Sequence, residues 1–261
     1  MKLTRTQRQD HQKAIDILNS GRAHMYDERR AVIERYHEGA NHNNAAASAF
    51  FTPFDMAFHL ALNVENGGKL LDLCSGIGAL TVGILSHGQD FDEIVMVEIN
   101  PDYCDVARKL VPQAEVIQGS IYDAVLIDEL RSRGFRTVVS NPPFGTISKP
   151  KGAQGPRYKG EVHYETIDIA SDLADYGAFI LPQTACPFTY SGRQEYRETE
   201  NLKYEAFRKA TGISLEIGIS VDTSVLGKFR NTPITVELVT SDFKEAQSLR
   251  APKQAELDLA A

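Results

Sequence analysis

The sequence Asn141-Pro142-Pro143-Phe144 has the residue types needed to act on an amino group. The two prolines stiffen the chain, so the Asn141 side-chain oxygen and the Pro142 carbonyl can face one point. Two acceptors at one point suit a planar amine such as N6 of adenine. Accepting both amine hydrogens favours a pyramidal nitrogen, whose lone pair can attack a methyl group, while Phe144 offers a face for stacking the base. Catalysis would then consist mainly of positioning and charge stabilisation, because the proton can leave after the nitrogen becomes cationic.

A glycine-containing turn at residues 72–78 could hold the second reactant. Gly76 and Gly78 permit a tight turn and close backbone approach to a ligand. Glu98 follows about 20 residues later, where a carboxylate can accept hydrogen bonds from both ribose hydroxyls. These residues predict a cofactor that contains adenosine, and both NAD and S-adenosyl-L-methionine fit. The lack of a third glycine favours S-adenosyl-L-methionine, as does Asp72, whose carboxylate would repel a pyrophosphate and attract a sulfonium or amino group.

Strands alternate with helices through the centre of the sequence, and this order predicts the scaffold. We expect an α/β fold of Rossmann-like, doubly wound type, with a mostly parallel seven-stranded sheet whose last two strands could form an antiparallel edge. The glycine turn and residues 141–144 then both lie at carboxyl ends of strands, where such sheets bind ligands. The expected strands are 69–73, 93–99, 115–118, 137–140, 177–182, 215–219 and 235–240, and the expected helices are 56–62, 79–86, 103–110, 121–133 and 166–175.

The chain of 261 residues is 42% apolar, enough for one α/β domain with extensions. We expect a helical extension over 1–49, the α/β domain over 50–243 and a flexible tail over 244–261. No apolar run approaches the roughly 18 residues of a membrane span, and the polar amino terminus is not a signal peptide, so a cytoplasmic location is expected. Three widely spaced cysteines without a CxxC motif predict reduced thiols, and the seven histidines show no metal-ligand cluster, so no metal is expected.

The formal net charge of −7 excludes a protein coated in basic charge. A nucleic-acid partner would therefore need a local basic patch. Residues 145–160 provide one directly after residues 141–144, with four cations and no acid. The candidate substrate-binding residues are Lys149, Lys151, Arg157, Tyr158 and Lys159, with Lys228 and Phe229 as an opposite wall. A basic loop that is merely solvated is the alternative reading of this segment.

Taken together, these motifs resemble the class I S-adenosylmethionine-dependent methyltransferases that methylate amino groups and carry an (N/D)PP(Y/F) motif. The resemblance covers about residues 50–240. Phe51-Thr52-Pro53 resembles the segment that precedes the sheet in many bacterial N6-adenine DNA methyltransferases and contacts the methionine end of the cofactor. Either Ser120 or Asp123 would meet the cofactor's adenine. The cofactor-binding residues that the resemblance implies are Phe51, Thr52, Pro53, Asp72, Cys74, Ser75, Gly76, Gly78, Glu98, Ile99, Ser120, Ile121 and Asn141.

The function expected from these residues is methyl transfer from S-adenosyl-L-methionine to N6 of adenine, with DNA favoured over RNA as partner. Residues 141–146 followed by lysines, with Lys228-Phe229 before the last strand, are also similar to small N6-adenine methyltransferases of ribosomal RNA. Protein glutamine methyltransferases use a similar motif with Tyr, so Phe144 and the basic loop favour a base. A non-catalytic nucleotide-binding module is a further alternative, and Asn141 occupies the place where a cytosine-C5 enzyme would need a nucleophilic cysteine.

Overall fold

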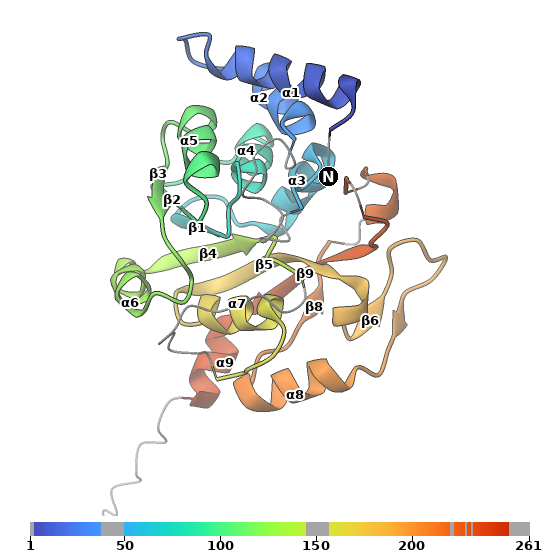
Figure 1. The fold of residues 1–261 in the computed structure, drawn as a ribbon. Coiled ribbons are helices and arrows are strands. Elements are labelled where there is room, and N and C mark those ends of the chain that lie inside the picture. The colour runs from blue at the N-terminus through green and yellow to red at the C-terminus, as the bar shows by residue number, and fades with distance from the viewer. Residues whose placement is uncertain are drawn as a thin grey trace, which may run out of the picture.

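The computed structural model describes residues 3–37, 50–144, 157–219, 222–227, 229–230 and 232–250. Three of the predicted substrate-binding residues, Lys149, Lys151 and Lys228, lie outside these ranges. Within them, seven strands form one sheet in the order β3-β2-β1-β4-β5-β9-β8 (Figure 1). The strands are β1 (Lys69–Leu73), β2 (Glu93–Glu98), β3 (Glu115–Gln118), β4 (Phe135–Ser140), β5 (Ala174–Pro182), β8 (Glu216–Ile217) and β9 (Val236–Asp242).

The sheet has the predicted mixed character. The first five strands in this order pair in parallel, whereas β9 runs antiparallel to both β5 and β8. Parallel pairing brings the carboxyl ends of β1, β2, β3 and β4 to one edge of the sheet, which is where the glycine turn and Asn141 follow their strands. The α/β Rossmann-like fold class expected from the sequence is confirmed.

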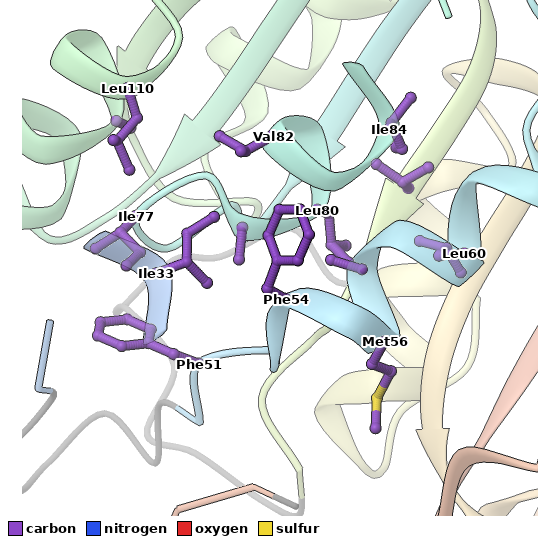
Figure 2. Packing of buried hydrophobic residues seen from close by; sticks show 14 of the residues in the cluster. Ile33, Phe51, Phe54, Met56, Leu60, Ile77, Leu80, Val82, Ile84 and Leu110 are labelled. Carbon is purple, nitrogen blue, oxygen red and sulfur yellow. The ribbon is translucent and has the colours of Figure 1, made fainter. Parts of the chain in front are cut away.

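Helices cover both faces of the sheet and create two hydrophobic cores (Figure 1). Figure 2 shows the first core, in which Phe54 and Leu60 meet Leu80 and Ile84. The helices on this face are α1 (Arg5–Leu18), α2 (Tyr26–Arg35), α3 (Phe54–Leu60), α4 (Ala79–Ser86) and α5 (Pro101–Leu110). The other face carries α6 (Ala124–Arg133), α7 (Val162–Ala170), α8 (Leu202–Thr211) and α9 (Phe243–Arg250).

Local signals explain why several elements begin or end where the sequence predicts. The expected bounds of β1, α4 and β3 coincide with the observed ones. Gly78 has φ +89°, a left-handed conformation that suits glycine, and it starts α4. Asn100 caps α5 by accepting from the Asp102 amide, and Pro101 occupies its first turn.

Other elements differ from expectation. The helix expected over 166–175 is α7, Val162–Ala170, which is buried all round and therefore has no amphipathic period to mark its bounds. The helix α8 and a two-stranded hairpin, β6 (Phe188–Thr189) with β7 (Arg197–Glu198), were not expected. The beginning of the expected tail forms α9, in which Phe243 and Ala246 are buried. None of the helices in the described ranges is long and apolar enough to cross a membrane.

The segment that precedes the sheet is positioned by a close helix contact. Gly83 of α4 lies so near α3 that a Cβ atom built there would be 2.5 Å from the Ala57 carbonyl carbon and 2.7 Å from the Ala57 Cβ atom. Because α3 begins directly after Phe50–Pro53, this contact sets where that segment meets the carboxyl edge of the sheet.

We predict that Gly83→Ala destabilises the protein by about 1–3 kcal/mol, because the added methyl group overpacks the α3–α4 contact. Without such a contact, replacing glycine by alanine in a helix interior would stabilise the protein by about 1 kcal/mol. A loss of stability would therefore indicate the close contact, and a gain would argue against it. Urea unfolding measures it, with Ser86→Ala in the same helix as a control expected to stay within about 0.5 kcal/mol. A Gly83→Ala variant as stable as the wild type would show that the two helices do not meet so closely.

Candidate active site

A pocket opens at the carboxyl edge of the sheet, between the loops after β1, β2, β3 and β4 and the segment before α3. Most residues predicted from the sequence line it together. They are Phe51, Thr52, Cys74, Ser75, Gly76, Glu98, Ile99, Ser120, Ile121, Asn141, Pro142, Pro143 and Phe144. The sequence reasoning missed Phe50, Asn100, Tyr103, Tyr122 and Val162, which also line it. Tyr103 and Val162 come from helices, where a buried apolar residue gives no signal of a pocket wall.

Glu98 holds the glycine turn from the end of β2. Its carboxylate accepts from the Gly76 amide at 2.8 Å and from the Asn100 amide at 2.8 Å. Burial raises the pKa of Glu98, and these two amides partly oppose that effect. Each carboxylate oxygen keeps acceptor capacity beyond its amide, so Glu98 can still receive hydroxyl groups from a ligand in the pocket.

The pocket lining does not include Asp72, Gly78 or Pro53, and their contact with the cofactor stays a prediction. The Asp72 side chain is fully buried and accepts from the Thr81 hydroxyl at 2.7 Å, which ties β1 to α4. Burial raises the pKa of Asp72 to about 7. Gly78 leaves room for Met96, whose Cε atom would lie 2.8 Å from an added Cβ. Pro53 begins α3, so all three shape the turn or the segment beside it.

The Asn141 side chain is fixed by two acceptors on the segment before α3. Its Nδ2 atom donates to the Phe50 carbonyl at 3.0 Å and to the Thr52 hydroxyl at 2.9 Å. A carbonyl only accepts, so the amide can have just one orientation, with Nδ2 towards Phe50 and Thr52. The Asn141 Oδ1 atom is buried and has no hydrogen-bond partner in the described parts of the chain. It is therefore an acceptor in the pocket wall that awaits a donor.

Three phenylalanines gather beside Asn141. The ring of Phe144 stacks at 6.2 Å from Phe50, and the ring of Phe229 meets both edge-on, at 6.5 Å from Phe50 and 6.3 Å from Phe144. Phe229 is only 4% exposed and reaches the pocket wall through its contacts with the other two rings. A flat aromatic group entering next to Asn141 would meet this cluster.

The loop after β3 decides between the two residues left open by the sequence. Ser120 lines the pocket, and its hydroxyl accepts from the Tyr122 amide at 3.2 Å. Asp123 instead caps α6, accepting from the amides of Val125 at 3.0 Å and Leu126 at 3.3 Å. Geometry therefore places Ser120, and not Asp123, where a ligand in the pocket can be contacted.

Two of the predicted substrate-binding residues are held elsewhere by the fold. Arg157 pairs at 2.8 Å with Asp168 of α7 and at 2.7 Å with Asp172, which follows the end of that helix. The ring of Tyr158 packs edge-on against Tyr164 and Phe207, each at 5.6 Å. Intramolecular partners thus engage both side chains, and their contact with a polynucleotide stays a prediction. Lys159 is exposed.

The comparisons with known proteins agree with the predicted scaffold. A family model described as the methyltransferase small domain matches residues 52–153. A proposed RNA methyltransferase from Pyrococcus horikoshii is similar in structure, with a TM-score of 0.51 and 16% identity over 83% of this chain and 97% of the other. The chain has a class I methyltransferase fold. No curated protein matches the sequence.

Two further solved structures share this fold. The methyltransferase subunit of a type I restriction-modification system from Streptococcus thermophilus has a TM-score of 0.57 and 14% identity, over 83% of this chain and 48% of the other. A proposed class I S-adenosylmethionine-dependent methyltransferase from Listeria monocytogenes has a TM-score of 0.54 and 12% identity, over 89% and 79%. With the family match, they support S-adenosyl-L-methionine as the cofactor, as the sequence predicts. The residues in the described ranges form no metal-binding cluster.

We predict that Glu98→Gln weakens S-adenosyl-L-methionine binding at least tenfold, because one oxygen that now faces a backbone amide would become an NH2 group. Binding by the wild type should weaken as the pH falls through the raised pKa of Glu98, above the range of an ordinary glutamate. Calorimetric titration between pH 5 and 8 measures both, and Glu129→Gln on the exposed face of α6 is the control. A wild-type affinity that is flat across this range would contradict the assignment.

Proposed function

We propose that this protein transfers the methyl group of S-adenosyl-L-methionine to N6 of adenine in DNA. The observation that supports this most directly is the Asn141 Oδ1 atom, which is buried, fixed in orientation and without a partner in the described chain. It lies in a pocket wall shared by the Glu98 side of the sheet and by the phenylalanine cluster. One pocket can thus receive an adenosine cofactor and a second planar amine.

The chemistry follows from the acceptors. Asn141 Oδ1 and the Pro142 carbonyl receive the two N6 hydrogens, which favours the pyramidal nitrogen and directs its lone pair away from the ring. S-adenosyl-L-methionine supplies an electrophilic methyl group on a cationic sulfur. The new N–C bond forms as the S–C bond breaks, and the nitrogen then releases a proton to water. No side chain has to act as a strong base, so the residues contribute position and charge.

The remaining pocket residues divide between cofactor and base. We assign Glu98 to the ribose, Ser120 and Ile121 to the cofactor's adenine, and the Phe51–Thr52 pair to its methionine end. The phenylalanine cluster of Phe50, Phe144 and Phe229 is assigned to the substrate base. A base within a duplex would have to be flipped out, at a cost of a few kcal/mol.

The polynucleotide would cross the pocket mouth close to the segment that follows Phe144. Lys159 is exposed at the end of that segment, and Lys149, Lys151 and Lys228 remain predicted contacts. DNA is favoured by the similarity of Phe51-Thr52-Pro53 to bacterial N6-adenine DNA methyltransferases. RNA is the second candidate, because the proposed RNA methyltransferase from P. horikoshii is matched over 97% of its length.

Asn141→Ala should reduce methyl transfer at least 1000-fold, because the variant removes the acceptor for N6. The cofactor should still bind, because Glu98 and the residues around it are unchanged. The test incubates each protein with labelled S-adenosyl-L-methionine and separate DNA, RNA and protein pools. We expect wild-type label in DNA and almost none with the variant. Label in the protein pool alone would refute a nucleic-acid substrate, and label in RNA alone would transfer the proposal to RNA.

Lys159 and Arg157 are nearby cations that can be compared to test which of them contacts phosphate. Lys159→Ala should lower the salt dependence of oligonucleotide binding by about one unit of slope, as expected for one lost phosphate contact. Arg157→Ala should leave the slope unchanged but destabilise the protein by about 1–3 kcal/mol, because buried Asp168 loses its ion pair with Arg157 and keeps the Tyr158 amide and the more distant Arg250 as partners. Binding as a function of salt and urea unfolding measure the two effects. A reduced slope for Arg157→Ala would show that its ion pairs open for phosphate.

A further inference from the structure

The Thr52 hydroxyl can link Asn141 to a ligand in the pocket, because it accepts one hydrogen bond and can donate another. Its Oγ1 atom accepts from Asn141 Nδ2 at 2.9 Å, so the hydroxyl proton points to some other acceptor. No protein atom in the described ranges accepts that proton, although Thr52 is only 4% exposed. The side chain lines the pocket, and the acceptor that it lacks can therefore come from a bound ligand.

Among the described residues, Asn141 Oδ1 lacks a hydrogen-bond donor, whereas the Thr52 hydroxyl lacks an acceptor. Both hydrogens of its Nδ2 atom are used, one by the Phe50 carbonyl and one by Thr52, whereas Oδ1 is buried without a partner in the described chain. The chain of donors therefore runs one way, from an amine in the pocket to Asn141, from Asn141 to Thr52, and from Thr52 to an acceptor in the pocket. Hydrogen bonds in such a chain polarise and strengthen one another.

We propose that Thr52 is a positioning residue that couples cofactor occupancy to the orientation of Asn141. This inference rests on the proposed function and adds a specific relay to it. An acceptor group of the cofactor takes the Thr52 proton, which makes Thr52 Oγ1 a better acceptor for Asn141 Nδ2. The amide is then held more firmly, with Oδ1 set to receive the N6 hydrogens. Phe50 supplies the second anchor through its backbone, so no side-chain change there can imitate the effect.

The surroundings of Thr52 keep this relay rigid. The segment lies between two packed elements, since Phe51 meets Tyr103 of α5 at 4.9 Å between ring centroids and Pro53 begins α3. The glycine turn is equally close, because a Cβ at Gly76 would lie 3.5 Å from the Phe51 ring. A threonine hydroxyl in a segment fixed on both sides can transmit a change of hydrogen bonding without moving the backbone.

The test compares Thr52→Val, Thr52→Ser and a matched control, Thr137→Val. Valine keeps the shape of threonine and removes the hydroxyl, while serine keeps the hydroxyl. Thr137 is suited as control because it is buried on β4, four residues before Asn141, and its hydroxyl has no partner in the described structure. Circular dichroism and thermal unfolding establish that each variant is folded.

The first readout is the Kd for S-adenosyl-L-methionine by calorimetry, which requires no substrate. Thr52→Val should weaken binding about 3- to 30-fold, and Thr52→Ser and Thr137→Val should stay within twofold of the wild type. The second readout is kcat for the nucleic-acid pool at saturating cofactor. There Thr52→Val should lose about 10- to 100-fold, because only the Phe50 carbonyl then holds the Asn141 amide, and Thr52→Ser should recover most of the rate.

An unchanged Kd for Thr52→Val would overturn the link to the cofactor, and an unchanged kcat at saturating cofactor would overturn the link to Asn141. Failure of the proposed function looks different, because the wild type itself would then methylate no adenine. The Kd comparison would still decide whether the Thr52 hydroxyl meets the cofactor. A loss in Thr137→Val equal to that in Thr52→Val would assign both to general destabilisation.

Discussion

The site depends on the hydrogen bonds that join Asn141 to Phe50 and Thr52, across about ninety residues of sequence. Asn141 follows β4 in the middle of the sheet, and Thr52 precedes α3 on one of its faces. Neither element can fix the amide alone. The sheet sets the position of the Asn141 backbone. The contact of α3 with Gly83 sets the position of the Phe50 carbonyl and the Thr52 hydroxyl, which accept from the Asn141 amide. The orientation of one carboxamide is thus a consequence of the whole layered fold.

The same pocket contains buried polar groups that a ligand can bind. Glu98 is buried and its pKa is raised. Its carboxylate accepts from two backbone amides and can still accept hydrogen bonds from a ligand. Ser75 Oγ and Asn141 Oδ1 are buried without partners in the described chain, and each such atom costs about 1–3 kcal/mol. A ligand that satisfies them removes this cost, so polar groups left unsatisfied by folding become available for binding. Arg133 and Arg157 are engaged in ion pairs with acidic side chains.

The sequence predicted the centre of the fold well because local signals agree there with burial. Apolar strands bounded by glycine turns gave β1, α4 and β3 with their observed bounds. The helix α8 was missed, although Asn201 caps it and Gly212 ends it, because only one narrow side of the helix is buried. The intramolecular partners of Arg157 and Tyr158 could not be predicted from the sequence. Their partners, such as Asp168, belong to an α7 that reveals its position only when it is packed under the sheet.

The most direct test of this account is the position of the methyl group. Nucleic acid treated with the protein and labelled S-adenosyl-L-methionine is digested to nucleosides, and the labelled nucleoside is identified by mass spectrometry against synthetic standards. An amide oxygen that accepts from an exocyclic amine predicts that the label is found in N6-methyladenine. A label on a ring nitrogen or on a carbon atom would contradict the account, because Asn141 Oδ1 would then not be holding the amine that reacts. A label on the exocyclic amine of another base would contradict the assignment to adenine.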